Sequence, residues 1–356
     1  MNAVLDDRTC PSATDGEIAA INLESARRCG WARFVRDPRR PGVAEEVVDN
    51  ERLVAQFLGD LAALDRLEAL ASQFAAVDDS PRAALVHAEV ASTVHRFDDA
   101  RACLARAVLM GAERVAIERQ SLAIDQACGV ELEAVLAARR RIATMSKRLE
   151  DVVPLGAVLA DLERFAEADA IYRNAFRTHD GVSPFPLAWV CFQLGMLWGE
   201  LVPVPAPNRA ALWYRRAIGY LPGYVKARVH LAEICASQGR TEEAEVLLRP
   251  ALPSGDPEVR WRLADVLAAQ QRFDEANMQL DAARRGFDEL LGRHLHAFAD
   301  HAAEFYAGSG NDCRRAVELA RANVANRPTR RAVRQAQAIA VAARDAAASE
   351  LMLDLG

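Results

Sequence analysis

The stretch LAEICASQGRTEEAEVLLRPALPSGDP, residues 231–257, decides the fold class of this chain. Small residues stand in it at Ala232, Ala244 and Ala251, and Gly239 lies between the first two. A small residue lets two helix axes approach closely, whereas a large side chain at the same place would hold the helices apart. The stretch therefore predicts two short antiparallel helices that pack against each other, the second beginning near Gly239.

The same small-residue pattern recurs along the chain at a fixed interval. Ala210 and Ala244 are 34 residues apart, and Ala100 and Ala168 are 68 apart, which is twice that interval. The double interval predicts a degenerate unit between them, centred on Ala134. The positions expected to mark the middle of each unit are Ala100, Ala134, Ala168, Ala210, Ala244, Ala276 and Ala316.

This spacing resembles the tetratricopeptide repeat family, whose unit is a helix–turn–helix of 34 residues. The resemblance covers roughly residues 80–330, with five good units and one degenerate unit. It implies an all-α fold, a right-handed α-α superhelix (solenoid) of antiparallel helix pairs. Departures from the pattern are a longer, proline-rich loop at 199–208, an insertion just before it, and extra residues between Ala283 and Ala316.

We expect four segments along the chain. Residues 1–14 are expected to be a disordered tail, and 15–80 a helical segment with a possible degenerate repeat. The repeat array is expected over 81–328, and residues 329–356 are expected to form capping helices that close the solenoid.

Composition narrows the class of protein. Hydrophobic residues make up 51% and charged residues 26%, which is typical of a packed globular core and not of a disordered chain. The net charge of −6 disfavours general binding to nucleic acid or to an anionic membrane. The seven cysteines are scattered without a C-x-x-C pair, and no stretch approaches the ~18 apolar residues of a membrane span. We therefore expect a cytoplasmic protein with no membrane segment and no cofactor.

No catalytic or metal-binding signature is found. The chain lacks the phosphate-binding loop G-x-x-x-x-G-K-[ST], the dinucleotide motif G-x-G-x-x-G and the nucleophile motif G-x-S-x-G. The densest histidine group is His294, His296 and His301, without an H-E-x-x-H pattern. A metal site there would need a further ligand from another element, so helix packing is the preferred interpretation. We expect the protein not to be an enzyme.

Two arginine clusters deserve a separate interpretation. The first contains Arg27, Arg28, Arg33, Arg36, Arg39 and Arg40, together with Trp31 and Phe34, and the second contains Arg327, Arg330, Arg331 and Arg334. Such clusters can contact phosphates and stack on bases. In a chain of net negative charge, however, a solvated helix face is the preferred interpretation. Docking of an acidic protein segment comes second, and nucleic-acid binding comes third.

The resemblance also implies a binding surface, because first-helix residues of each unit line the concave groove in this family. Transferring that register gives Trp189, Phe192, Met196, Lys226, Val229, Glu233, Glu258, Trp261, Asp265, Phe298, His301 and Phe305 as groove residues. An aromatic strip with acidic edges suits an amphipathic helix or an extended peptide. The alternative is that these aromatic side chains simply pack on their neighbours.

We therefore expect a non-catalytic scaffold or adaptor that binds a peptide or a partner protein in its concave groove. Two alternatives stay open: a regulator or accessory factor that senses a small peptide or metabolite, and nucleic-acid binding through the arginine clusters. A fold-level resemblance does not decide among them, because one fold serves many functions.

Overall fold

A computed structural model describes residues 11–146 and 148–353, and all regular structure in this part of the chain is helical. The helices are α1 (Gly16–Arg36), α2 (Val43–Leu58), α3 (Ala62–Val77), α4 (Pro81–Thr93), α5 (Phe97–Leu109), α6 (Arg114–Cys128), α7 (Leu132–Ser146), α8 (Leu149–Asp161), α9 (Phe165–Thr178), α10 (Pro184–Met196), the π-helical turn η2 (Leu197–Leu201), α11 (Pro207–Tyr220), α12 (Val225–Ser237), α13 (Thr241–Leu248), the 3-10 turn η3 (Arg249–Ser254), α14 (Pro257–Ala269), α15 (Phe273–Ala307), α16 (Cys313–Asn326) and α17 (Arg330–Leu353).

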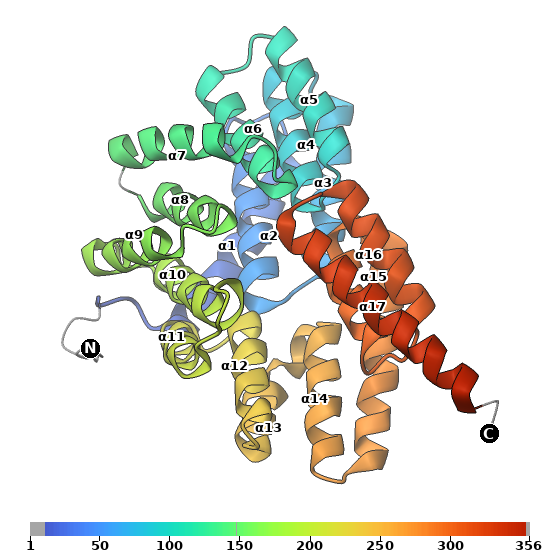
Figure 1. The fold of residues 1–356 in the computed structure, drawn as a ribbon. Helices are drawn as coiled ribbons and strands as arrows, with labels where there is room; N and C mark the ends of the chain where they lie inside the picture. Colours follow the sequence, from blue (N-terminus) through green and yellow to red (C-terminus); the bar gives the residue numbers. More distant parts are fainter. Residues whose placement is uncertain (1–10, 147, 354–356) are drawn as a thin grey trace.

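From α4 onward the helices form antiparallel pairs stacked side by side into a right-handed solenoid (Figure 1). The second helix α13 begins at Thr241, close to the Gly239 where the sequence predicts it, and α5 and α9 begin at Phe97 and Phe165, just before the marks Ala100 and Ala168. Most of the small residues that mark the units are buried between helices: Ala100, Ala168, Ala210, Ala244 and Ala316 are 0% exposed and Ala276 is 5% exposed. The all-α solenoid predicted from the repeat interval is confirmed.

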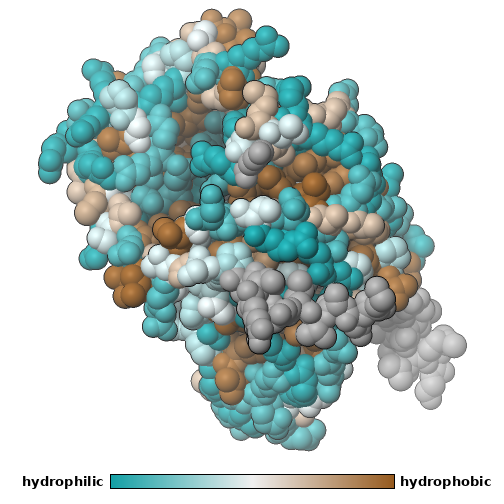
Figure 2. All heavy atoms as spheres, turned by 90° about the vertical axis from the view of Figure 1, so that its left-hand side faces the viewer, coloured by the Kyte–Doolittle hydropathy of each residue, from teal (hydrophilic) through white to brown (hydrophobic). Residues whose placement is uncertain are grey.

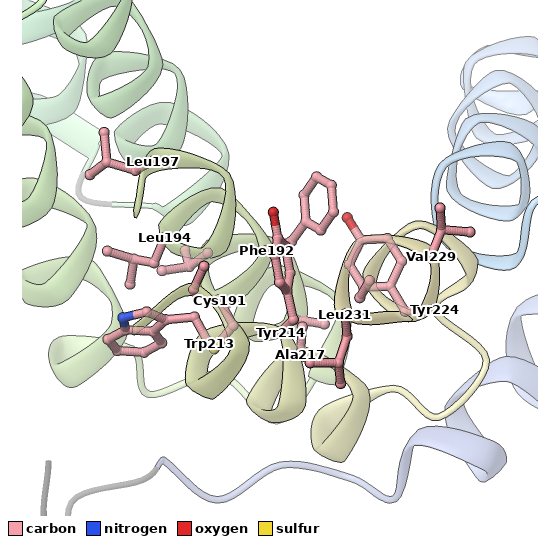
Figure 3. Packing of buried hydrophobic residues seen from close by; sticks show 14 of the residues in the cluster. Cys191, Phe192, Leu194, Leu197, Trp213, Tyr214, Ala217, Tyr224, Val229 and Leu231 are labelled. Atoms are coloured by element: carbon pink, nitrogen blue, oxygen red, sulfur yellow. The ribbon is translucent and has the colours of Figure 1, made fainter. Parts of the chain in front are cut away.

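The packing of α10 against α11 and α12 shows why small residues are needed (Figure 3). Tyr214 on α11 is 1% exposed, and its ring lies against α10 at Gly195. A Cβ atom on Gly195 would lie 2.6 Å from Tyr214 Cδ1, closer than carbon atoms pack. The ring can lie there only because that position of α10 has no side chain.

The degenerate unit is present as the pair α6 and α7, but its predicted mark is displaced. Ala134 is exposed, whereas Val135 and Leu136 are each 2% exposed and join the main core. Successive residues of an α-helix are about 100° apart around its axis, so the neighbouring residues carry the contact that Ala134 was expected to make. The larger aliphatic side chains gain more from burial than an alanine does.

The extra residues between Ala283 and Ala316 form helix rather than loop. They lie in and after α15, a 35-residue helix in which the second helix of one unit runs into the first helix of the next. The backbone leaves helical geometry only at His294, with φ −134° and ψ 52°, and α15 bends there. Phe273, at the start of α15, is 55% exposed and does not pack under the preceding turn as Phe97 does.

The N-terminal helices pack in chain order onto α4, and α1 and α2 also contact α10 and α12 across the concave side (Figure 1). Phe57 on α2 is 2% exposed, and its ring centroid lies 5.2 Å from that of Phe185 and 4.9 Å from that of Tyr224. Gly59 ends α2 with a left-handed φ of +68°, and a Cβ there would lie 2.9 Å from Val225. Residues of α2 thus join the core of the array.

The two ends of the chain also contact the array. Most of the expected disordered tail, residues 1–10, lies outside the described residues. Residues 11–14 differ from that expectation: the Tyr220 hydroxyl donates to Pro11 O at 2.9 Å, and Thr14 N–H donates to Val182 O at 2.7 Å. At the other end, the single helix α17 occupies the region where capping helices were expected, and it packs on α16.

Candidate ligand-binding cavity

The concave side contains a partly open cavity of about 1120 Å³. Residues of α2, α4, α6, α8, α10 and α12 line it. The second half of α15, the end of α16 and the start of α17 line a further side. Ligand pockets usually measure roughly 300–1,000 Å³, so the cavity has room for at least a drug-sized ligand.

The middle of the cavity is aromatic. Phe185, Trp189 and Phe192 face it from α10, Met196 follows them, and Phe298 approaches from α15. Phe192 is 8% exposed because its ring lies against Tyr214, Tyr224 and His230, at centroid distances of 5.6, 5.2 and 5.4 Å. Trp189 is only half-buried, and its indole N–H has no hydrogen-bond acceptor among the described residues. The wall therefore offers apolar area together with a free donor.

A network of charged groups lies where α12 approaches α15. His230 Nδ1 is 2.8 Å from Glu200 and 3.3 Å from Glu233, and His301 Nδ1 is 3.3 Å from Glu258. Burial alone would lower the pKa of His230, but hydrogen bonds to the two glutamates raise the pKa to about 10. The charge of Asp300 is the main reason that the pKa of His301 rises to about 9.

Both histidines are therefore protonated near neutral pH, and each serves as the cation of an ion pair. Asp300 is also paired with Arg327, and the neighbouring cations hold the pKa of Asp300 at about 2 against the opposing effect of burial. A general base needs a pKa near the operating pH. The pKa values of His230, His301 and Asp300 lie far from neutral pH, and each group is held by an oppositely charged partner. We therefore interpret the network as structural. Among the described residues no group of histidine, cysteine and acidic side chains is arranged to hold a metal ion.

His95, in the turn after α4, has a lowered pKa, whereas those of His230 and His301 are raised. Burial, with Arg327 nearby, lowers its pKa to about 4, so its ring is neutral. The ring stacks on Phe97 at 5.3 Å, and its Nδ1 lies 3.2 Å from the carbonyl oxygen of His296. This contact joins the turn after α4 to the bend of α15, across the cavity from the aromatic wall.

Of the groove residues predicted from the sequence, one group lines the cavity: Trp189, Phe192, Met196, Lys226, Phe298 and His301. The others lie elsewhere. Val229, Trp261 and Phe305 are 1%, 4% and 0% exposed, and the Trp261 ring packs on Phe305 at 5.6 Å.

The acidic residues predicted along the edge of the groove, Glu233, Glu258 and Asp265, are already paired with other side chains of the chain. Glu233 pairs with His230 and Arg262, and Asp265 accepts a 2.6 Å hydrogen bond from Ser309. Glu258 is 8% exposed and pairs with His301.

Some cavity residues were not predicted. Asp49, Arg52 and Gln56 come from α2, whose position depends on the fold of the whole chain. Arg139 comes from α7, the second helix of the degenerate unit. The sequence indicates Arg139 only weakly. It is a charged residue one helical turn after Val135 and Leu136, on the face of the helix that these two buried residues share.

The two arginine clusters are engaged largely within the chain. Arg27 pairs with Glu24 and Glu51, Arg33 pairs with Glu46, and Arg39 donates to the carbonyl oxygen of Val77 at 2.7 Å.

In the second cluster, Arg330 and Arg334 lie 3.4 and 2.5 Å from Glu163. Arg331 lies 3.2 Å from Glu200. These pairs connect the start of α17 to the turn after α8 and to η2, while the three arginine side chains stay 60–68% exposed.

The outer surface is mixed in character. On the face shown in Figure 2, hydrophilic side chains predominate and hydrophobic ones form small separate groups. No helix in the described part of the chain is long and apolar enough to cross a membrane.

Comparisons with known proteins agree with the helix-pair geometry. A family model described as tetratricopeptide repeat matches residues 225–250 and 257–277. No curated protein matches the sequence.

Solved structures with a similar fold include the apo form of the quorum sensor NprR from B. thuringiensis, at 14% identity and a TM-score of 0.46, covering 91% of this chain and 95% of that one. Another is the C-terminal part of a TPR repeat-containing protein from Cytophaga hutchinsonii, at 12% identity and a TM-score of 0.33, covering 82% and 97%. Yeast Tom70 is a third, at 13% identity and a TM-score of 0.34, covering 86% and 76%. Each likeness is one of fold alone.

The chain thus belongs to the class of helical-repeat solenoids. Within it, residues 225–250 and 257–277 match the tetratricopeptide repeat, the family that the 34-residue interval resembles.

Proposed function

We propose that this chain is a non-catalytic, cytoplasmic binding protein that holds a peptide segment of a partner protein in its concave cavity. The observation that carries the proposal is the aromatic wall of α10, where Trp189 faces a cavity of about 1120 Å³ with an unused hydrogen-bond donor. Half-buried tryptophans with apolar surroundings are typical anchors of binding sites. Proteins of this repeat fold typically bind protein partners.

The position of α2 bears on the form of the ligand. Through Phe57, α2 packs against Phe185 of α10 and Tyr224 at the start of α12, and it occupies part of the concave side. The remaining space is bounded by walls from both ends of the chain and favours a short extended segment.

A second candidate function is the sensing of a free small peptide or metabolite. The observation that favours it is the partial closure of the cavity by α15, α16 and α17. A free ligand can enter such a cavity completely. A peptide segment of a partner protein stays joined to the rest of the partner, so the cavity needs an opening through which the chain can pass.

The test uses random dodecapeptides displayed on phage and selected on the purified full chain. Peptides that are selected are synthesised, and their affinities are measured by fluorescence anisotropy for the wild type and for Trp189→Ala. Loss of a buried aromatic anchor is expected to weaken binding by about thirtyfold, since such residues contribute roughly 2 kcal/mol or more.

The matched control is Leu212→Ala on α11, where the leucine is 61% exposed and does not line the cavity. Its affinity is expected to equal that of the wild type. Equal affinity in the Trp189 variant, with helicity unchanged, would refute binding in this cavity. Failure to select any peptide, together with a thermal shift produced by a free metabolite, would favour the second candidate.

A further inference from the structure

Arg139 is a buried charged group in the cavity wall that has no ion-pair or hydrogen-bond partner among the described residues. Arg139 on α7 is 7% exposed and lines the cavity, and its Nε is buried without a hydrogen-bond acceptor. No hydrogen bond or ion pair joins its guanidinium to any other described residue. In folded proteins buried charges are normally paired, because removing a charge from water is costly.

The carboxylates near Arg139 are already used by other arginines. Asp151 is 3% exposed and is held by Arg119, with oxygen–nitrogen distances of 2.5 and 3.3 Å. Glu150 lies 3.5 Å from Arg148. Arg119 and Asp151 also line the cavity and are the charged groups that act on Arg139, so two guanidinium groups share one carboxylate, and that carboxylate is paired with Arg119.

Arg139 cannot relieve this cost by losing its proton. Burial lowers the pKa of Arg139, the charge of Asp151 opposes this and that of Arg119 adds to it, but an arginine stays charged in proteins. The planar guanidinium presents a fork of donors that matches the two oxygens of a carboxylate. An anion that enters the cavity would therefore find a desolvated, unpaired and geometrically suited donor.

We propose that the end of the cavity formed by α6, α7 and the start of α8 binds a carboxylate of the peptide ligand through the guanidinium of Arg139. This inference rests on the proposed peptide-binding function and adds the charge of the ligand to it. The peptide would place its carboxylate at Arg139 and its apolar residues along the aromatic wall of α10, which is next to α8 in the array.

The inference makes a stability prediction that needs no ligand. Arg139→Met keeps the length of the side chain and removes an unpaired buried charge, so its melting temperature is expected to equal or exceed that of the wild type. The matched control, Arg119→Met, leaves the buried Asp151 without its partner and is expected to melt clearly lower. A melting temperature of Arg139→Met that falls as far as that of Arg119→Met would show Arg139 to be a structural residue and would overturn the proposal.

The binding test uses three octapeptide libraries on the full chain, with retained peptides identified by mass spectrometry. The first library has free C-termini, the second is amidated at the C-terminus, and the third has free C-termini but lacks Asp and Glu. Retention by the wild type is expected to require a carboxylate, and Arg139→Met is expected to weaken it about tenfold or more. If retention is lost with the amidated library, the group that binds Arg139 is the C-terminal carboxylate. If retention is lost with the library that lacks Asp and Glu, the group is an acidic side chain.

The outcomes separate this inference from the function on which it rests. Peptides whose retention depends on Trp189 but not on Arg139, or on no carboxylate, would overturn the carboxylate site and leave the peptide-binding function standing. If the wild type retains no peptide from any library, both are overturned.

Discussion

The docking of α2 on the concave side of the array predicts that Phe57→Ala is strongly destabilising. Full burial of a phenylalanine side chain stabilises a protein by about 1.5–3 kcal/mol, and Phe57 is 2% exposed. Its removal also leaves a cavity and ends the ring contacts with Phe185 and Tyr224, so we expect the free energy of unfolding to fall by about 3–5 kcal/mol. That is a large part of the roughly 5–15 kcal/mol that holds a typical protein folded.

The assay is urea unfolding at 25 °C, followed by far-UV circular dichroism and by tryptophan fluorescence. Repeat arrays can unfold in stages, so the two signals are compared before one free energy is derived from them. The control is Val35→Ala on α1, whose side chain is 74% exposed and which should change stability by less than about 0.5 kcal/mol. A loss below about 1 kcal/mol for Phe57→Ala, with an unchanged slope against urea, would refute the packing of α2 on the array.

Three further predictions concern packing, pH and the closure by α17. Gly195→Ala should cost about 1–3 kcal/mol in urea unfolding despite the better helix propensity of alanine, because the new Cβ would lie 2.6 Å from Tyr214 Cδ1. Gly219→Ala on the exposed side of α11, where no atom lies within 4 Å of the new Cβ, should instead be neutral or stabilising by up to about 1 kcal/mol, and equal effects of the two changes would contradict the packing argument. The pKa of His230 is raised from its ordinary value of 6.5 to about 10, which gives a stabilising contribution that is complete below pH 6.5 and is lost as the pH rises through about 10. The urea midpoint should therefore fall from pH 7 to about pH 10 more steeply in the wild type than in His230→Gln, and parallel profiles would count against the ion pairs. Arg334→Ala should change the free energy of unfolding by less than about 1 kcal/mol, because its side chain is 68% exposed, and a larger loss in a thermal melt would show that the closure is stronger than a surface ion pair.

The helix pairs could be predicted from the sequence because their information is local. Ala210 and Ala244 pack against helices of their own unit or the next one, so a small residue repeated every 34 positions reports the contact directly. The prediction of the degenerate unit succeeded for the helix pair and missed the contact residue: Ala134 is exposed, and Val135 and Leu136 are buried instead. An interval fixes where a helix lies along the chain, but a shift of one residue turns its face by about 100°.

The cavity could be predicted only in part. Trp189, Phe192 and Met196 line it because they are on a first helix of the array, where the family register places the concave surface. Trp261 stands at an equivalent position, yet it is buried because Phe305 and the end of α15 cover it. The register gives the direction of a side chain and does not say what another part of the chain places over it.

The sequence by itself determined the helical-repeat class, the positions of the helix pairs and the small residues between them, since each of these depends on neighbours within one or two units. The tertiary structure alone decided that α2 lies on the concave side, that α17 lines one side of the cavity, and that Arg139 lines the same cavity without a partner. Phe57 meets Tyr224 across 167 residues of chain, and Arg331 meets Glu200 across 131. Contacts at such separations follow no repeat interval, because they depend on how the curvature of the whole array brings its two ends together.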